Sequence, residues 1–118
     1  MDILNSRDIK ENDAVMFDID DTLIRSVDGS LIIPVVNLLH GAKSLGYKIV
    51  IITARPYSDY VVEHTVNQLK VNGITYDALG FAPPDQKGKM KRDLKFNFIL
   101  SVGDMPTDLT DSEYGILV

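Results

Sequence analysis

The sequence predicts a three-layer α/β fold in which helices cover both faces of a parallel sheet. Three apolar runs support this prediction, at residues 14–17, 49–52 and 98–102. Each run is too short for a buried helix and is bounded by polar residues, which is typical of a strand buried on both faces. Segments with helical periodicity lie between these runs. Strands that alternate with helices indicate a parallel sheet.

The segment after the first strand is expected to form a hairpin and then a helix. Asp28 and Gly29 are a hairpin turn signal between two short apolar runs. Pro34 is well suited to be the first residue of the helix, and Gly46 is a plausible stop. The apolar stripe of this helix consists of Val35, Leu38, Leu39, Ala42 and Leu45.

In the middle of the chain, the sequence predicts one more helix and one more strand. Ser58 or Asp59 can cap a helix that ends at residues 72–73. A short strand follows at residues 78–81, and the prolines at 83–84 interrupt the chain before a helix rich in lysine. The apolar side of the capped helix consists of Val62, Thr65, Val66 and Leu69.

The end of the chain is expected to form a last helix over residues 106–114 and an edge strand over residues 116–118. The whole of residues 1–118 is expected to form one domain, because this length can bury roughly two thirds of its unfolded surface. The apolar content of 45% and the charged content of 25% are ordinary for a globular protein.

Composition also narrows the function classes. The sequence has no Cys, which excludes disulfides, thiolate catalysis and cysteine-based zinc sites. Residues 1–11 lack the apolar core of a signal peptide, and no apolar run approaches the ~20 residues that cross a membrane. We therefore expect a cytoplasmic protein with no membrane partner.

The charge is negative overall but unevenly distributed. A net charge of −5 argues against general polyanion binding, which depends on Lys and Arg contacts to phosphates. Residues 87–95 nevertheless contain five basic residues and one acid. This cluster either helps to hold a phosphorylated substrate or is mainly the solvated face of a helix with one functional Lys, and we favour the second interpretation.

Carboxylates gather directly after the first strand, at Asp18, Asp20 and Asp21, with Thr22 beside them. Crowded carboxylates repel one another and are costly to bury without compensation. A proton or a divalent cation can supply that compensation, and Mg²⁺ suits oxygen ligands of this kind. An ordinary polar turn is the alternative interpretation of this stretch taken alone.

Polar residues also follow the other two strands. The second strand ends at Thr53, and the third leads into Asp104 and Asp108. Groups beyond the carboxyl ends of parallel strands converge in one crevice. We therefore expect these three residues to meet Asp18 and Asp20 at one site.

From about residue 14 to its end, the sequence resembles the haloacid dehalogenase (HAD) superfamily of phosphohydrolases. Asp18, Asp20 and Thr22 match its first motif, an apolar strand followed by Asp-x-Asp-x-Thr. Thr53 matches the second motif, and the stretch 103–108, Gly-Asp-x-x-x-Asp, matches the fourth. The third motif is a Lys upstream of the fourth, and Lys87, Lys89 and Lys91 are all candidates. Lys87 is favoured by its spacing from Leu94, and Lys89 is the second choice.

The resemblance implies a Rossmann-like parallel sheet and a Mg²⁺-dependent phosphatase. Asp18 would attack phosphorus to form an aspartyl-phosphate, and Asp20 would act as general acid and then general base. Mg²⁺ would be bound by the Asp18 and Asp104 carboxylates and by the Asp20 main-chain carbonyl. Thr53 and Lys87 would hold the phosphoryl oxygens. These roles are those of nucleophile, acid–base catalyst and electrostatic clamp.

The remaining residues near the motifs would support these groups. The resemblance implies that Asp108 orients a water on the metal or the motif Lys. Thr22 is expected to brace its loop, and Arg55 to contact a distal part of the substrate or to form a structural salt bridge. Gly103 is expected to permit a tight turn from strand to loop.

The spacing of the motifs leaves no room for a cap domain, since a small flap at Asp28–Gly29 and ordinary helices use up residues 23–52 and 54–86. A capless site is open, which favours a bulky phosphorylated substrate: a nucleic-acid end, a phosphoprotein or a large metabolite. A homo-oligomer could cover the site instead.

Two other function classes are compatible with a fold of this kind. One is a receiver-like signalling domain that accepts a phosphoryl group, but its expected order places the Lys after the acids, whereas here Asp104 and Asp108 follow Lys87. The other is a catalytically silent interaction module. Every motif position is filled, which favours an enzyme.

Overall fold

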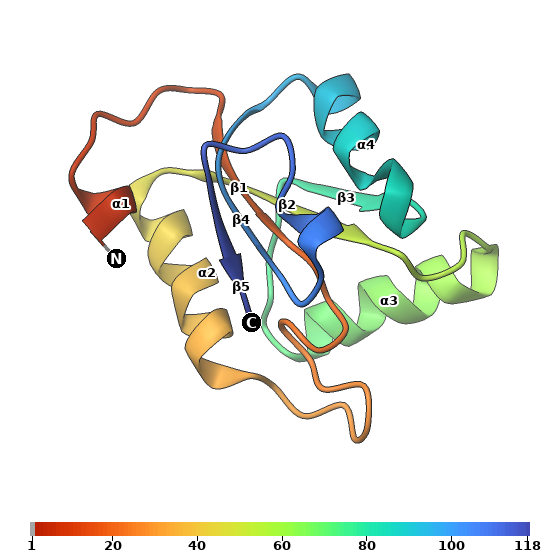
Figure 1. Cartoon of the computed structure of the whole chain (residues 1–118). Coiled ribbons are helices and arrows are strands. Elements are labelled where there is room, and N and C mark those ends of the chain that lie inside the picture. Colours follow the sequence, from red (N-terminus) through yellow and green to blue (C-terminus); the bar gives the residue numbers. More distant parts are fainter. Residues whose placement is uncertain (1) are drawn as a thin grey trace.

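The computed structural model describes residues 2–118, and it contains one sheet of five parallel strands. The strand order is β3-β2-β1-β4-β5, so β1 lies at the centre (Figure 1). This is the Rossmann-like parallel sheet that the sequence predicts. The strands are β1 (Asp13–Phe17), β2 (Lys48–Thr53), β3 (Ala78–Phe81), β4 (Asn97–Gly103) and β5 (Tyr114–Leu117).

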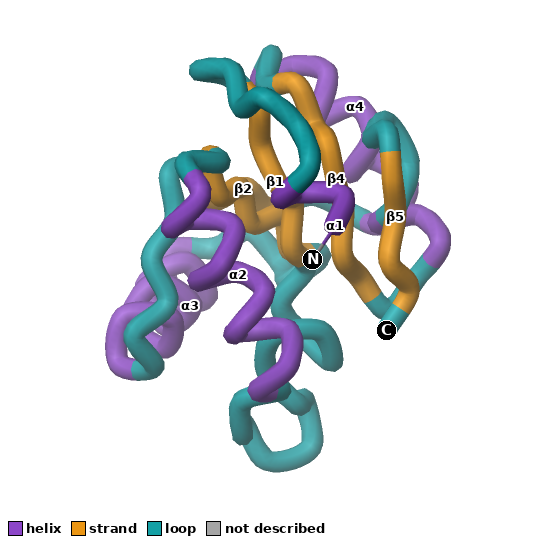
Figure 2. The backbone as a smooth tube through the Cα atoms, turned by 90° about the vertical axis from the view of Figure 1, so that its left-hand side faces the viewer, coloured by secondary structure: helices purple, strands orange, loops and turns teal. Residues whose placement is uncertain are grey.

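Helices lie on both faces of the sheet, which gives three layers (Figure 2). The side chains of β1 alternate between the two faces, as those of any strand do. Val15 and Phe17 pack with α2 and with Leu69 of α3, whereas Met16 packs with Met90 of α4. The helices are α1 (Asp2–Asn5), α2 (Ile33–Leu45), α3 (Asp59–Val71) and α4 (Lys87–Leu94), and 3₁₀ turns occupy Pro84–Gln86 and Pro106–Asp108.

The ends of the helices follow the predicted signals. Pro34 is the second residue of α2, one position later than expected. Gly46 ends that helix in the left-handed conformation, with φ of 107°. The hydroxyl of Ser58 accepts a hydrogen bond from the backbone N–H of Val61 and caps α3. The apolar stripes are narrower than expected, since Leu45 and Val66 are exposed.

The expected hairpin is present as a turn without regular strands. Gly29 has φ of 74°, and the backbone N–H of Arg25 donates to the carbonyl of Ser30. A single antiparallel bridge joins Ile24 to Leu31. This flap and α2 occupy the interval between β1 and β2, and α3, β3 and a 3₁₀ turn occupy the next interval, so neither interval contains a cap domain.

The predicted helix over residues 106–114 is wrong. Only Pro106–Asp108 forms a 3₁₀ turn, and Asp111 then takes a left-handed conformation with φ of 57°. Short polar side chains after the turn compete for backbone hydrogen bonds and so favour turns over helix. The edge strand that follows is confirmed as β5. Within residues 2–118, no helix is long and apolar enough to span a membrane.

Candidate active site

The predicted site residues lie at the carboxyl ends of β1, β2 and β4 and at the start of α4, and all of them except Thr53 line a cavity of about 350 Å³. The wall of the cavity is formed by the segments that follow these three strands, by Pro84 of the 3₁₀ turn and by the first residue of α4. Five aspartates and two basic residues line it, so acidic side chains outnumber basic ones at its wall. The cavity lies where an open parallel sheet is expected to bind ligands.

Lys87 forms the centre of the buried part of the site. Its ammonium donates to Asp18 Oδ1 at 2.9 Å and to Asp108 Oδ1 at 2.6 Å. All three residues are at most 6% exposed. Because Lys87 begins α4, the strand end of β1, the helix start and the loop after β4 are tied together at one point.

Three carboxylates surround this one ammonium. One oxygen each from Asp18, Asp104 and Asp108 lie within 4.8 Å of one another. Burial raises the pKa of Asp18, Lys87 lowers it, and the nearby Asp108 and Asp104 also raise it, so that the net pKa is about 7. Burial alone would lower the pKa of Lys87, but Asp18 and Asp108 outweigh it, so that its net pKa is raised and the ammonium stays charged.

This set of donors fits a metal ion. One ammonium does not balance three carboxylates, and buried carboxylate oxygens are the ligands of hard divalent cations. The structure places Asp108 in this group beside Asp18 and Asp104, whereas the sequence placed Asp108 outside the metal ligands. The Asp20 side chain lines the same cavity but is not part of this group, and the binding of metal by its main-chain carbonyl stays a prediction.

Asp20 forms a two-pronged ion pair with Arg55. The Nε atom of Arg55 donates to Asp20 Oδ2 at 3.0 Å, and its second terminal nitrogen donates to Asp20 Oδ1 at 2.8 Å. The remaining nitrogen donates to Thr65 Oγ1 of α3 at 3.0 Å. The sequence suggested carboxylates as the neighbours of Asp20, but its close partner is a guanidinium. Of the two roles expected for Arg55, substrate contact and a structural salt bridge, the structure shows the salt bridge.

The two threonines of the motifs, Thr22 and Thr53, are buried. Thr53 Oγ1 accepts from the backbone N–H of Arg55 at 3.2 Å, which shapes the turn that carries Arg55. Thr22 Oγ1 lies 3.5 Å from Asp18 Oδ2, at the long end of the hydrogen-bond range. Thr22 is thus buried in its loop next to Asp18, and its role as a brace stays a prediction. The contact of Thr53 with a phosphate stays a prediction.

The three candidate lysines have different environments. Lys87 reaches the acids, whereas Lys89 is exposed and pairs with Asp93 at 2.7 Å. Lys91 is 1% exposed, and burial lowers its pKa to about 8. Its ammonium donates to Ser101 Oγ and to the carbonyls of Asp108 and Thr110.

The sequence interpretation missed the second buried lysine. It assigned one functional Lys to the basic cluster and the other basic residues to solvent. Lys89, Arg92 and Lys95 are indeed exposed, but Lys91 is not. The spacing of four residues between Lys87 and Lys91 was the available signal, because such residues share a helix face.

The loop after β4 is packed tightly around Asp108. A Cβ atom on Gly103 would lie 2.3 Å from Asp108 Cβ, so only glycine fits there. The backbone N–H of Met105 donates to Asp108 Oδ2 at 3.2 Å. The hydroxyl of Thr107 is buried at the cavity without a hydrogen-bond partner, and no sequence pattern pointed to it. It is therefore available to a bound group.

Comparisons with known proteins show a similarity of fold. No protein-family model and no curated protein matches the chain. A chain in a structure of the Pnkp1/Rnl/Hen1 complex aligns with a TM-score of 0.69 and 22% identity, over 94% of this chain and 47% of that one. A chain of the Pnkp1/Rnl/Hen1 RNA repair complex aligns with a TM-score of 0.71 and 23% identity, over 95% and 44%. The sequence thus spans less than half the length of each of these two chains.

Proposed function

We propose that residues 1–118 form a single HAD-like phosphatase domain that hydrolyses phosphomonoesters with Mg²⁺ through an aspartyl-phosphate on Asp18. The observation that supports this best is the environment of Asp18. Its carboxylate lies at the end of the central strand, contacts Lys87 at 2.9 Å, and has oxygens of Asp104 and Asp108 within 4.8 Å. A nucleophile, a phosphate-binding cation and spare metal ligands thus meet in one cavity.

The reaction has two displacement steps. An oxygen of Asp18 attacks phosphorus and forms an acyl phosphate, while the bond from phosphorus to the leaving oxygen breaks and that oxygen takes a proton from Asp20. Water then attacks the phosphorus of the acyl phosphate and gives its proton to Asp20, which releases phosphate and restores Asp18. Asp20 must carry a proton in the first step, so its ion pair with Arg55 has to loosen when substrate binds.

The other polar groups hold the phosphate and the metal. The carboxylates of Asp18 and Asp104 and the main-chain carbonyl of Asp20 would hold Mg²⁺, which when bound would offset the repulsion between Asp18 and the incoming phosphate. The Lys87 ammonium would bind a phosphoryl oxygen in both steps. Asp108 keeps that ammonium in place, and Thr53 would donate its hydroxyl to another phosphoryl oxygen.

The open cavity is suited to a bulky substrate. Among a nucleic-acid end, a phosphoprotein and a large metabolite, we favour a nucleic-acid end. This preference is supported by the likeness in fold to chains of an RNA repair complex. The absence of a cap domain from the intervals between β1, β2 and α4 is compatible with a polymer end entering the site.

Hydrolysis of a generic aryl phosphate tests the proposal. We expect turnover that requires Mg²⁺ and is lost in Asp18→Asn, a variant that keeps the shape of the side chain but removes the nucleophile. Turnover that is unchanged in the variant would contradict the proposal. Stable phosphorylation by a small phosphodonor without turnover would identify a receiver-like domain instead.

A further inference from the structure

An aromatic pair of one exposed and one half-buried ring, Tyr57 and Phe81, lies beside the proposed phosphatase site. Tyr57 is 82% exposed, and its ring packs against the ring of Phe81 with centroids 5.7 Å apart and planes tilted by 56°. Single exposed apolar residues are common and need no explanation. This pair is different because Phe81 lines a groove and Tyr57 follows a residue, Pro56, that lines the active-site cavity.

Two cavities lie close to this aromatic pair. Phe81 and Pro83 line a groove of about 430 Å³, while Pro56 and Pro84 line the active-site cavity. Tyr57 follows Pro56 directly in the chain, and its ring contacts Phe81, so the pair connects a residue next to the active-site cavity with a residue of the groove. Phe81 pairs in register with Thr53, so it lies at the same edge of the sheet as the site. It is two strands from β1, or about 10 Å.

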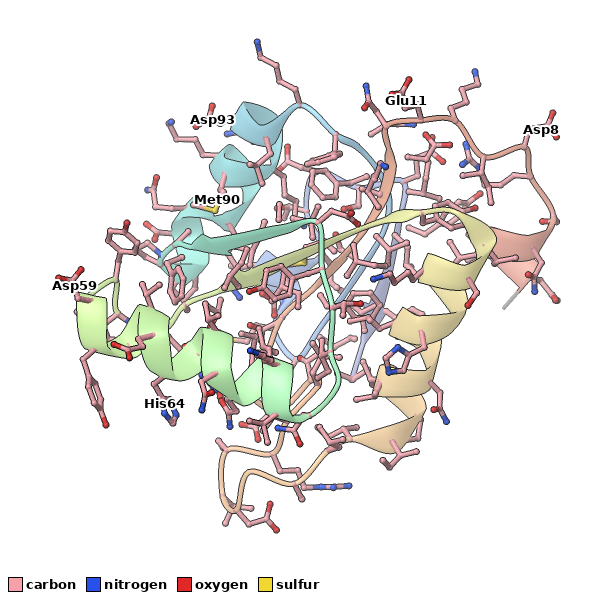
Figure 3. The ribbon with its side chains drawn as sticks, turned by 180° about the vertical axis from the view of Figure 1, so that it is seen from behind. Asp8, Glu11, Asp59, His64, Met90 and Asp93 are labelled. Carbon is pink, nitrogen blue, oxygen red and sulfur yellow. The ribbon has the colours of Figure 1, made fainter. Side chains whose placement is uncertain are left out.

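The groove differs from the active-site cavity in charge. The active-site cavity is lined by five aspartates and two basic residues. The groove carries one acid and one base, Asp93 and Lys89, which neutralise each other at 2.7 Å. Its other walls are largely apolar and include Met90 and Leu94 of α4 (Figure 3 shows Met90 and Asp93 on this helix). An uncharged, apolar part of a ligand suits the groove better than a second phosphate.

Few basic side chains are available to follow a nucleic-acid backbone. Of the five basic residues at 87–95, Lys89 and Arg92 are in ion pairs with acids, and Lys87 and Lys91 are buried. The net charge of −5 further weakens contacts to a polyanion. Recognition of a nucleotide must therefore depend more on its base than on successive phosphates.

We propose that Tyr57 and Phe81 stack on the nucleobase of the nucleotide whose phosphate is hydrolysed. This inference rests on the proposed phosphatase function and narrows its substrate to a nucleoside monophosphate or the terminal nucleotide of a single strand. Bases stack on aromatic side chains irrespective of sequence, because every base has a π-face. The sugar links the phosphate, held at Asp18 and Lys87, to the base at the groove.

The base can be isolated by comparing substrates. We expect kcat/KM for adenosine 5′- or 3′-monophosphate to exceed that for the corresponding ribose phosphate by roughly 5- to 150-fold. Tyr57→Ala should bring this ratio close to one, and Tyr57→Trp should retain it. The ratio is measured within each variant, so a loss of folded protein does not alter it.

Tyr60→Ala is the matched control. Tyr60 is 78% exposed and also lies in the segment after β2, but its ring stacks on His64 of α3 with centroids 6.3 Å apart. Figure 3 shows His64 on the side of α3 that points away from α4. This variant should keep the native ratio. An equal loss in Tyr60→Ala and Tyr57→Ala would overturn the assignment.

A binding measurement separates the inference from the phosphatase proposal. Dissociation constants of the same ligands for Asp18→Asn should show the same preference for the base and the same loss in Asp18→Asn/Tyr57→Ala. If no phosphate ester is hydrolysed, the phosphatase proposal fails, while this binding ratio still tests the stacking surface. A ratio near one for the native Tyr57 in both assays, or concentration-dependent self-association that Tyr57→Ala abolishes, would overturn the inference.

Salt dependence gives a second test with a short single-stranded oligonucleotide that ends in a phosphate. If one nucleotide is recognised by stacking, the slope of log K against log salt should be no steeper than about −1. A slope several times steeper would show that many phosphates are contacted, and would overturn the stacking account.

Discussion

At the residue scale, Asp18 is buried among more carboxylates than nearby positive charges can neutralise. Its carboxyl group shares the single ammonium of Lys87 with Asp108, and Asp104 adds a third carboxylate nearby. The same feature that fits the site to a cation therefore makes the metal-free site electrostatically unfavourable when all the acids are ionised.

This leads to a prediction about pH and stability. The pKa of Asp18 is raised to about 7, above its value of about 3.9 in an unfolded chain. Between these values the folded state binds more protons, so stability without metal should fall as the pH rises from about 4 to about 7. The free energy of unfolding in urea with a chelator checks this. Asp18→Asn, or saturating Mg²⁺ with the native protein, should flatten the slope, and an identical slope in Asp18→Asn would contradict the assignment.

Arg55 supplies a second prediction at this scale. A lysine cannot replace the two parallel hydrogen bonds that the guanidinium gives Asp20. We expect Arg55→Lys to lower kcat by up to about 100-fold with less effect on KM, because the acid–base group is misplaced. Arg92→Lys, which alters an exposed ion pair with Asp111, is the control and should change neither constant.

A double variant shows whether Arg55 acts through Asp20. If it does, Asp20→Asn/Arg55→Lys should be no slower than Asp20→Asn alone, because interacting residues are not additive. Independent, multiplying losses would instead indicate that Arg55 contacts the substrate itself.

At the element scale, α4 holds the site together through two lysines on one face. Lys87 reaches the acids, and one turn later Lys91 donates to two carbonyls of the loop after β4 and to Ser101. Lys91 therefore fixes the backbone from which Asp108 projects. It contacts neither the cavity nor any group expected to touch substrate.

Replacing Lys91 tests whether its hydrogen bonds stabilise the loop after β4. Lys91→Met leaves buried acceptors without a donor, and we expect it to cost about 3 kcal/mol in the free energy of unfolding and to weaken Mg²⁺ binding. Lys89→Met removes an exposed pair on the same helix and should cost no more than about 0.5 kcal/mol. Urea unfolding and Mg²⁺ titration measure both effects. Equal stabilities for the two variants would rule out the role assigned to Lys91.

The loop after β4 gives a prediction based on glycine. In Gly103→Ala the new Cβ would collide with Asp108, so we expect a loss of about 1–3 kcal/mol and of most activity. Gly41 lies inside α2 with nothing within 4 Å of its Cβ position. Gly41→Ala should therefore stabilise the protein by about 0.5–1 kcal/mol and keep full activity. Thermal unfolding and phosphatase assays compare the pair, and an active, stable Gly103→Ala protein would contradict this packing.

The elements show what local pattern can and cannot predict. Apolar runs and helix signals identified β1, β2, β3, β4, α2, α3 and α4, because burial and capping are encoded locally. The helix predicted after Pro106 was wrong because short polar side chains there favour turns, and because Lys91, 17 and 19 positions away, binds two carbonyls of the segment. The convergence of the acids was predictable from strand ends. The pairing of Arg55 with Asp20 was not, since two side chains 35 positions apart could have taken other partners.

At the scale of the whole molecule, the parallel sheet brings chemistry from four separate segments to one edge. Asp18 follows β1, Arg55 follows β2, Lys87 begins α4, and Asp104 and Asp108 follow β4. Only the flap at residues 23–32 is inserted between β1 and α2, so no cap domain lies between these elements, and the proposed substrate is correspondingly bulky. This architecture accounts for the proposed activity without a second domain.

The most direct test of the central proposal is to trap the intermediate on Asp18. The native protein is mixed with Mg²⁺ and a phosphomonoester that it hydrolyses, quenched in acid during turnover, and analysed by peptide mass spectrometry. We predict one phosphoryl group on Asp18, absent without Mg²⁺ and absent in Asp18→Asn. Steady turnover with no phosphoryl group on Asp18 at any quench time, or with one on another residue, would contradict the account.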